Sequence, residues 1–259
     1  MTPVTVFSCL PDWEAMLTCI YKARSSGIGH QNLRLELEPI GQTELFNNYI
    51  HVDYDEELTF KVIDAINNRI SSCFYSKLAY VSMAYEPDVL NTIYHVLILG
   101  FTYGESVLNR LEFRDIIRFN EINKRVGMEA CHFKEFLRFH EIRNSVYVAH
   151  IEPKSRIIPA LGMDFTDRMP SEHWIIVDDV HRVAAIHPKD EDYYIQNLND
   201  YEYEQLLKTE NENDEYTDLW QLFFDTIAIK ERENSRCQRN LFPLWTRTHA
   251  VEFIHRPDY

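Results

Sequence analysis

The chain has 259 residues, 45% of them hydrophobic and 13% aromatic, so it can bury the core of one large domain or two small ones. This composition excludes an intrinsically disordered chain, a collagen and a disulfide-stabilised miniprotein. A net charge of −15 opposes long-range attraction to nucleic acid and to anionic membranes.

The first half of the chain has the periodicity of helices, with a few short β-prone runs. Residues 4–10 are β-prone, and Asp12 is a suitable N-cap for the helix that follows. Further extended segments are expected at residues 33–37 and 49–52, and helices are expected from Asp55 and at residues 74–84, 89–101 and 107–126. This half is therefore predicted to be mainly helical.

From Gly127 the pattern changes to short strands and tight turns. Strands are expected at residues 136–139, 146–151, 174–177, 183–186 and 193–198, and one helix at residues 157–169. Short strands joined by tight turns indicate an antiparallel sheet rather than a parallel one. We therefore predict an α+β fold with an N-terminal helical region, a central antiparallel sheet and C-terminal helices.

The C-terminal part of the chain has an uneven distribution of charge. Residues 190–218 contain eleven Asp and Glu against one Lys, whereas residues 230–256 contain six Lys and Arg against three Glu. Residues 216–227 carry a clear apolar helix face. We expect an α+β core at residues 1–198, an acidic helix or linker at 199–215, and a helical basic segment at 216–259 that packs on the core.

Three arginines near the C-terminus recur at the spacing of one helix face. Arg232, Arg236 and Arg239 are separated by four and three residues, and none has an acidic residue four positions earlier. Guanidinium groups bind phosphate oxygens through paired hydrogen bonds, so this stripe suits a nucleic-acid backbone. A solvated or internally paired helix face has the same pattern. Arg138 and Arg247 complete the predicted set of nucleic-acid-binding residues.

Residues 129–139 interleave aromatic and basic side chains. On a strand, Lys134, Phe136 and Arg138 would share one face, which suits stacking on bases together with contact to phosphates. The same alternation describes an ordinary core strand, so both interpretations stay open.

Four residues are candidates for hydrolytic catalysis: Glu129, Asp164, Asp178 and His181. Asp178 and His181 place a carboxylate next to an imidazole, as a general base or a metal site requires. An Asp-Asp pair between two strands is also a common turn, because Asp accepts hydrogen bonds from its own backbone there. Whether the protein is an enzyme stays open on these residues alone.

The five cysteines are scattered and form no Cys-x-x-Cys pair, which indicates reduced thiols rather than disulfides or a zinc site. We therefore expect no cofactor, no structural zinc and no iron–sulfur cluster. The most apolar run, residues 94–101, is far shorter than the ~20 residues of a membrane helix. The N-terminus has no basic secretory segment, so a cytoplasmic protein without membrane attachment is expected.

The segment LWQLFFDTIAIKEREN at residues 219–234 resembles the C-terminal signature of a bacterial family of unknown function, described as probable DNA metabolism or putative DNA repair proteins. Further matches to that family are Gln-Arg at 238–239, Pro-Leu at 243–244, Glu-Phe at 252–253, and residues 136–139, 147–153 and 174–178. The resemblance covers nearly the whole chain, more loosely before Gly100.

The resemblance implies a DNA-linked role without a specified reaction. Genes of the family typically neighbour one for a radical-SAM protein with helix-hairpin-helix DNA-binding character, and some members are fused to uracil-DNA-glycosylase-like domains. The sequence departs from the family pattern at Cys131, where the family tends to have His, and at Met163-Asp164, where it tends to have Pro-His. If those histidines are catalytic or metal ligands, this member has an altered or lost activity.

We therefore expect a DNA-repair or DNA-processing protein that binds DNA through its C-terminal arginines and acts with a radical-SAM partner. One alternative is a metal-dependent hydrolase of nucleic acid that uses the four catalytic candidates. Another is a non-catalytic adapter, in which the acidic residues 190–218 dock a basic partner protein. The net charge weakens the DNA-binding hypothesis without excluding it.

Overall fold

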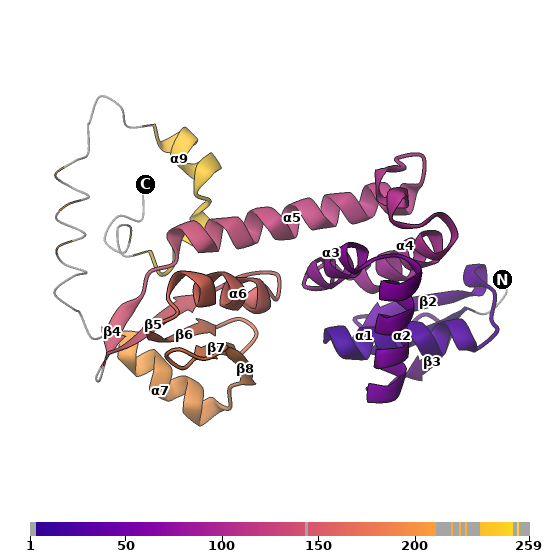
Figure 1. Cartoon of the computed structure of the whole chain (residues 1–259), viewed down its shortest axis with the longest axis horizontal. Coiled ribbons are helices and arrows are strands. Elements are labelled where there is room, and N and C mark those ends of the chain that lie inside the picture. The colour runs from indigo at the N-terminus through magenta and orange to yellow at the C-terminus, as the bar shows by residue number, and fades with distance from the viewer. Residues whose placement is uncertain are drawn as a thin grey trace. The chain divides into compact units, whose positions relative to one another are not determined.

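The computed structural model of the chain describes residues 4–142, 145–210, 219, 223, 226, 234–250 and 253. It divides into two compact units, Met1–Val126 and Gly127–Tyr259, whose elements are labelled in Figure 1. This boundary coincides with the change in sequence pattern at Gly127 and differs from the expected core of residues 1–198. The predicted apolar helix at 216–227 lies largely outside the described residues.

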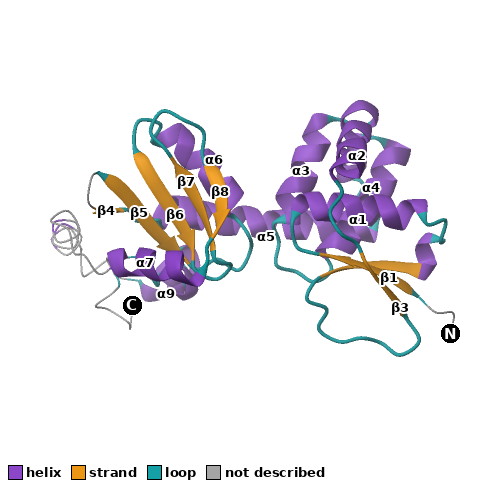
Figure 2. Cartoon of the chain, turned by 90° about the horizontal axis from the view of Figure 1, so that it is seen from below, coloured by secondary structure: helices purple, strands orange, loops and turns teal. Residues whose placement is uncertain are grey.

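The first unit contains a parallel three-stranded sheet with helices packed against it (Figure 2). Its strands are β1 (Thr5–Cys9), β2 (Leu33–Leu37) and β3 (Asn48–His51), in the order β2-β1-β3. Both outer strands pair in parallel with β1, and Val6 and Cys9 of that central strand are fully buried. Parallel neighbours need a crossover, which α1 provides between β1 and β2.

The helices of this unit are α1 (Trp13–Ser25), α2 (Glu56–Arg69), α3 (Ser72–Ser82) and α4 (Val89–Tyr103), with 3-10 turns η1 (His30–Asn32) and η2 (Glu105–Asn109). Asp12 is the N-cap residue of α1, as expected, but its side chain forms no capping hydrogen bond, whereas α2 and α3 do begin with one. Asp55 accepts a hydrogen bond from the Leu58 N–H at 3.0 Å, and Ser71 accepts one from the Phe74 N–H at 3.0 Å. These bonds satisfy donors that the first turn of a helix leaves unpaired.

The long helix α5 (Arg114–Phe136) begins in the first unit and ends in the second. The expected single helix at residues 107–126 is divided, because η2 ends at Asn109 and residues 110–113 are not helical.

The predicted strand at residues 136–139 is wrong, because α5 continues to Phe136. The helical period prevails here, since Val126, Ala130 and Phe133 lie three or four residues apart and are all buried. The strand with alternating aromatic and basic faces at residues 129–139 therefore does not form.

The second unit is built on a five-stranded mixed sheet in the order β4-β5-β6-β7-β8. The strands are β4 (His140–Ile142), β5 (Val146–Ile151), β6 (His173–Asp178), β7 (Val183–His187) and β8 (Tyr194–Asn197). Among these strands β5 and β6 are parallel, with α6 (Ile158–Arg168) in the connection between them, and the other three pairings are antiparallel. The predicted α+β class is confirmed, with antiparallel pairing predominant in this sheet.

An acidic helix and the C-terminal segment pack on the second unit. The described C-terminal elements are α7 (Asp200–Glu210), α9 (Ser235–Leu241) and the 3-10 turn η4 (Leu244–Thr246). Helix α7 buries Tyr203 against Val148 and Val177 of the sheet. The ring of Phe242 stacks on Phe136 at the end of α5, with 3.7 Å between ring centres. In the described part of the chain, no helix combines the length and apolar character needed to cross a membrane.

Gly100 in α4 lies close to the ring of Phe74 in α3, and a substitution can test this contact. A Cβ atom at this position would lie 2.5 Å from Phe74 Cζ, and Phe74 is fully buried. Overpacking costs about 1–3 kcal/mol, more than the roughly 1 kcal/mol of helix propensity that Gly→Ala gains, so we expect Gly100→Ala to lower the free energy of unfolding by about 1 kcal/mol. Urea unfolding measures it.

Gly41→Ala is the matched control, because a Cβ atom there would meet nothing within 4 Å. We expect this variant to unfold like the parent protein. A Gly100→Ala variant as stable as the Gly41→Ala variant would contradict the close packing of α4 on α3.

Candidate functional site

Two of the four catalytic candidates from the sequence are bound to neighbouring chain segments. Glu129 is buried on α5 and accepts a hydrogen bond from the backbone N–H of Lys154 at 2.6 Å. Asp164 on α6 forms ion pairs with Lys134 of α5 and with Arg168, both at 3.1 Å. Through these contacts the two carboxylates hold α5 against the segments beside it, which is a structural role.

Asp178 and His181 do meet, and their geometry is that of a turn. Asp178 Oδ1 accepts hydrogen bonds from the N–H groups of Val180 at 3.0 Å and His181 at 2.9 Å, and Oδ2 lies 2.6 Å from His181 Nδ1. An Asp that holds its own turn in this way is common between strands. Asp178 is 1% exposed, so burial also separates it from a ligand.

The neighbouring carboxylate, Asp179, instead holds two histidines. Its Oδ1 lies 3.0 Å from His150 Nδ1, and its Oδ2 lies 3.4 Å from His249 Nε2. The parallel register of β5 and β6 pairs Ile151 with Asp178, and the Asp179 N–H donates to the Ile151 carbonyl at 2.9 Å. Because the carboxyl ends of parallel strands meet at one edge of a sheet, His150 and Asp179 come together there.

His150 and His249 line a narrow cleft in the second unit. The other lining residues include Phe136, Arg138, Glu152 and Trp245. Thr248 Oγ1 donates to Glu152 Oε2 at 3.0 Å, and His249 Nε2 lies 3.8 Å from Glu152 Oε1. The cleft therefore combines imidazole, carboxylate, guanidinium and indole groups contributed by β5, the end of α5 and the C-terminal segment.

His150 is the most enclosed titratable group of this cleft. Its side chain is 1% exposed and that of Asp179 is 8% exposed. No described residue forms a hydrogen bond with His150 Nε2. The ring is therefore held through Nδ1, and its Nε2 is itself buried.

The sequence analysis missed the pairing of His150 with Asp179, although the sequence contains a signal at each residue. His150 stands in the otherwise apolar strand Val146–Ile151, where a titratable side chain is unusual. Asp179 was noted as part of a turn, but its partner is far away in sequence. The two departures from the family pattern, Cys131 and Asp164, do not line the cleft.

The predicted DNA-binding arginines fall into different environments. Arg236 and Arg239 are exposed on α9, three residues apart, whereas Arg232 lies outside the described residues. Arg138 lies two residues beyond the end of α5, and its Nη1 donates to the carbonyls of Glu135 and Leu137, both at 3.2 Å.

Arg247 is part of the core of the C-terminal segment. Only 6% of the residue is exposed, and its Nε and Nη2 atoms donate to the Phe242 carbonyl at 2.9 and 2.7 Å. The guanidinium also lies 4.4 Å from the ring centre of Phe253. Burial, together with the nearby charge of Arg239, holds the pKa of Arg247 below its usual range.

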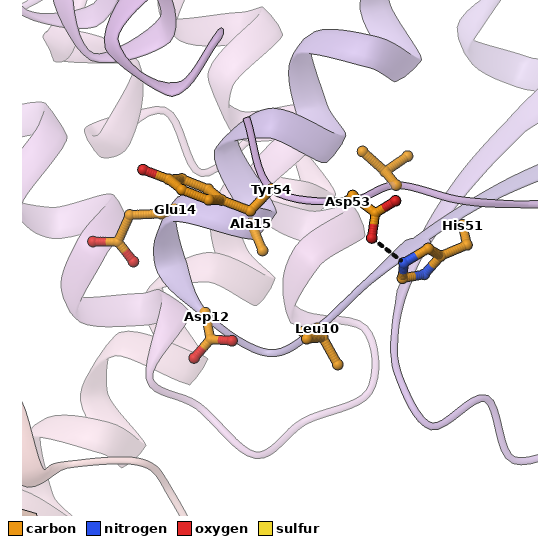
Figure 3. Close-up of a pocket in the computed structure, with 8 residues that line it drawn as sticks. Leu10, Asp12, Glu14, Ala15, His51, Asp53 and Tyr54 are labelled. Atoms are coloured by element: carbon orange, nitrogen blue, oxygen red, sulfur yellow. Dashed lines mark hydrogen bonds and ion pairs between the residues drawn. The ribbon is translucent and has the colours of Figure 1, made fainter. Parts of the chain in front are cut away.

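The first unit has a separate pocket of about 390 Å³, shown in Figure 3. It lies at the carboxyl ends of β1 and β3, where Leu10, Asp12, Asp53 and Tyr54 line it. In an open parallel sheet this edge is the usual place for a ligand. The acidic lining would favour a cationic group.

An exposed histidine at this pocket is held by two carboxylates. His51 Nδ1 lies 2.7 Å from Glu38 Oε1, and its Nε2 lies 3.1 Å from Asp53 Oδ1, the contact drawn in Figure 3. The hydrogen bonds that His51 makes to these carboxylates raise its pKa, and the bond to Glu38 has the larger effect. In turn, hydrogen bonds from His51 and from Ser8 lower the pKa of Glu38.

We expect Glu38→Gln to lower the pKa of His51 toward its ordinary value, because the neutral amide no longer favours the imidazolium. Proton–carbon NMR titration of the histidine ring measures this shift. The charged pair stabilises the fold at pH values between the pKa of Glu38 and the pKa of His51. This contribution is lost as the pH falls through the pKa of Glu38, and also as the pH rises through the pKa of His51. Glu44→Gln is the control, since Glu44 pairs with Arg34. A His51 pKa that is equal in both variants would contradict this pairing.

The residues of the cleft lie in a part of the chain that matches a protein-family model. Among the described residues, no group of three or more His, Cys, Asp or Glu side chains is arranged to hold a metal ion. Residues 87–252 match the model of a family described as a domain of unknown function, DUF4130. No curated protein matches the chain significantly. Since the match spans more than half of the sequence and includes every residue of the cleft, the chain belongs to the DUF4130 family.

Proposed function

We propose that the chain is a DNA-repair or DNA-processing protein that binds DNA through the C-terminal segment of its second unit. The observation that carries this proposal is the pair of arginines on α9, Arg236 and Arg239, which are both exposed and one helical turn apart. Guanidinium groups at this spacing suit two phosphates of a nucleic-acid backbone, because each can form paired, charge-assisted hydrogen bonds.

The same segment presents an aromatic ring beside a cation. Trp245 is 37% exposed, and Lys154 Nζ lies 4.9 Å from the centre of its ring. Proteins hold single-stranded nucleic acid by stacking bases on aromatic rings while cations contact the phosphates. We therefore expect single-stranded DNA to bind more tightly than duplex.

The net charge of −15 does not prevent this contact at short range. The acidic residues are concentrated at 190–218, whereas residues 230–256 carry an excess of basic side chains. Charges further apart than about 8 Å are largely screened at physiological ionic strength. The local basic surface of the C-terminal segment can therefore decide the interaction once DNA is close.

We further propose that a radical-SAM protein with helix-hairpin-helix character is the partner of this chain. The resemblance at residues 219–234 to proteins encoded beside such a gene supports this pairing. Co-purification of the two proteins in the presence and absence of DNA tests it.

The arginines of α9 allow a quantitative test of DNA binding. Replacing Arg236 and Arg239 together by Gln keeps helix propensity while removing two charges. Each lost phosphate contact should reduce the slope of log affinity against log salt by about one, so we expect a decrease of about two and weaker binding to all DNA sequences. Fluorescence anisotropy with labelled oligonucleotides over a salt series measures both effects.

A matched variant removes two charges from the other unit of the chain. Lys22 and Arg24 are exposed on α1, and their replacement by Gln changes the net charge by the same amount. We expect this control to keep the salt slope of the parent protein. An unchanged slope in a folded Arg236→Gln/Arg239→Gln variant, or an equal change in the control, would refute the proposed contact.

A further inference from the structure

We infer that the pocket of the first unit binds a small organic cation, in which an ammonium or guanidinium group is carried on an apolar body. The residues that line this pocket lie between Leu10 and Tyr54, outside the residues 87–252 that match the family model. Because the ligand and the part of the chain both differ from those of DNA binding, the two proposals can fail separately.

The pocket has the position and the size of a small-molecule site. It lies where β1 and β3 end, beside the first turn of α1, and its side chains are drawn in Figure 3. Ligands of open parallel sheets bind outside the carboxyl ends of the strands. The volume of about 390 Å³ is within the range of about 300–1,000 Å³ that small-molecule clefts occupy.

The apolar part of the lining suits the body of such a ligand. Ala15 and Val52 are 5% and 7% exposed and are the buried residues of the lining. Leu10 and Tyr54 are more than half exposed, so an apolar side chain and an aromatic ring remain accessible from solvent. An accessible aromatic ring also attracts cations to its face.

Two carboxylates of the pocket are available to a ligand. Asp12 is the N-cap residue of α1, yet its side chain forms no capping hydrogen bond, and Glu14 follows in the first turn. No described residue forms a hydrogen bond or an ion pair with the carboxylate of either. Asp53 differs, because its carboxylate is already paired with His51 at 3.1 Å. Asp12 and Glu14 can therefore bind a cation without losing a contact within the protein.

The charges around the pocket favour a cation over an anion. The amino end of α1 carries about half a positive charge, which by itself would attract an anion. Asp12 and Glu14 lie at this end and outweigh that charge. Partial burial has the larger effect in raising the pKa of Tyr54, and the charges of Glu56 and Glu14 raise it further. Negative charge thus prevails beside the ring, so a phosphate group would be repelled.

The experiment compares a cation with a neutral molecule of the same shape. The probes are benzylamine, which is cationic at neutral pH, and benzyl alcohol, in which a hydroxyl replaces the ammonium group. NMR titration of the methyl groups of Ala15 and Val52 measures both affinities and locates the bound probe. We expect benzylamine to bind about fivefold more tightly at low salt, and the difference to shrink at high salt because salt screens exposed charges.

The double variant Asp12→Asn/Glu14→Gln tests the two carboxylates. Neither change removes a side-chain hydrogen bond to a described residue, and thermal unfolding checks that the fold is kept. We expect the affinity for benzylamine to fall about fivefold and that for benzyl alcohol to stay unchanged. The matched control is Glu112→Gln/Glu121→Gln, because both carboxylates are exposed in the same unit and do not line the pocket. This control should bind both probes like the parent protein.

The variant Leu10→Ala tests the apolar lining without a change of charge. Leu10 is 55% exposed, so its truncation leaves the buried core in place. We expect both probes to lose affinity by the same factor of about two to three, because each loses the same apolar contact. This variant also keeps the inference testable if the double variant does not fold.

A lysine side chain of a partner protein presents the same cationic group as a free amine. N-acetyl-lysine methylamide is therefore a third probe. We expect it to bind more weakly than benzylamine, because its flexible chain loses more conformational freedom when bound. Tighter binding of this probe would overturn a small molecule as the ligand.

Several other results would also overturn the inference. They are equal affinity for benzylamine and benzyl alcohol, absence of benzylamine binding, methyl shifts confined to residues outside the pocket, equal losses in the double variant and its control, and unequal losses in Leu10→Ala. None of them affects the proposed DNA binding, which the salt dependence of the α9 variants tests on other residues.

Discussion

The parallel pairing of β5 with β6 is the constraint on which the cleft of the second unit depends. Its register brings the carboxyl ends of both strands to one edge of the sheet, where Asp179 bonds to the Ile151 backbone and its carboxylate meets His150. Antiparallel pairing would have placed these ends at opposite edges. The crossover through α6, which allows the parallel pairing, is therefore part of how the site is built.

Burial alone does not distinguish a functional carboxylate from a structural one in this unit. Glu129 and Asp178 are 7% and 1% exposed, and both accept hydrogen bonds from backbone N–H groups. Those bonds pair the backbone N–H groups of a turn or loop, so their loss would lower the free energy of unfolding. Asp179 has two imidazole rings as partners, and a carboxylate that orients a titratable ring can influence where protons are bound.

The C-terminal segment divides its arginines between the core and the surface. Arg247 packs against the rings of Phe242 and Phe253 and donates hydrogen bonds to a backbone carbonyl, whereas Arg236 and Arg239 lie exposed on α9. The stacking of Phe242 on Phe136 also ties this segment to the end of α5, beside the cleft. The exposed arginines are thus on the same segment of chain as Trp245 and His249, which line the cleft.

The sequence by itself determined the α+β class, most helices of the first unit and the short strands of the second, because spacing and capping act between near neighbours. It placed Asp55 as the start of α2, and the structure confirms this residue as the N-cap. Only the tertiary structure decided the order of the strands, the extension of α5 to Phe136, and the meeting of His150 with Asp179. Those features depend on which distant segments pack together, and a period along one segment contains no information about the partner that will bury it.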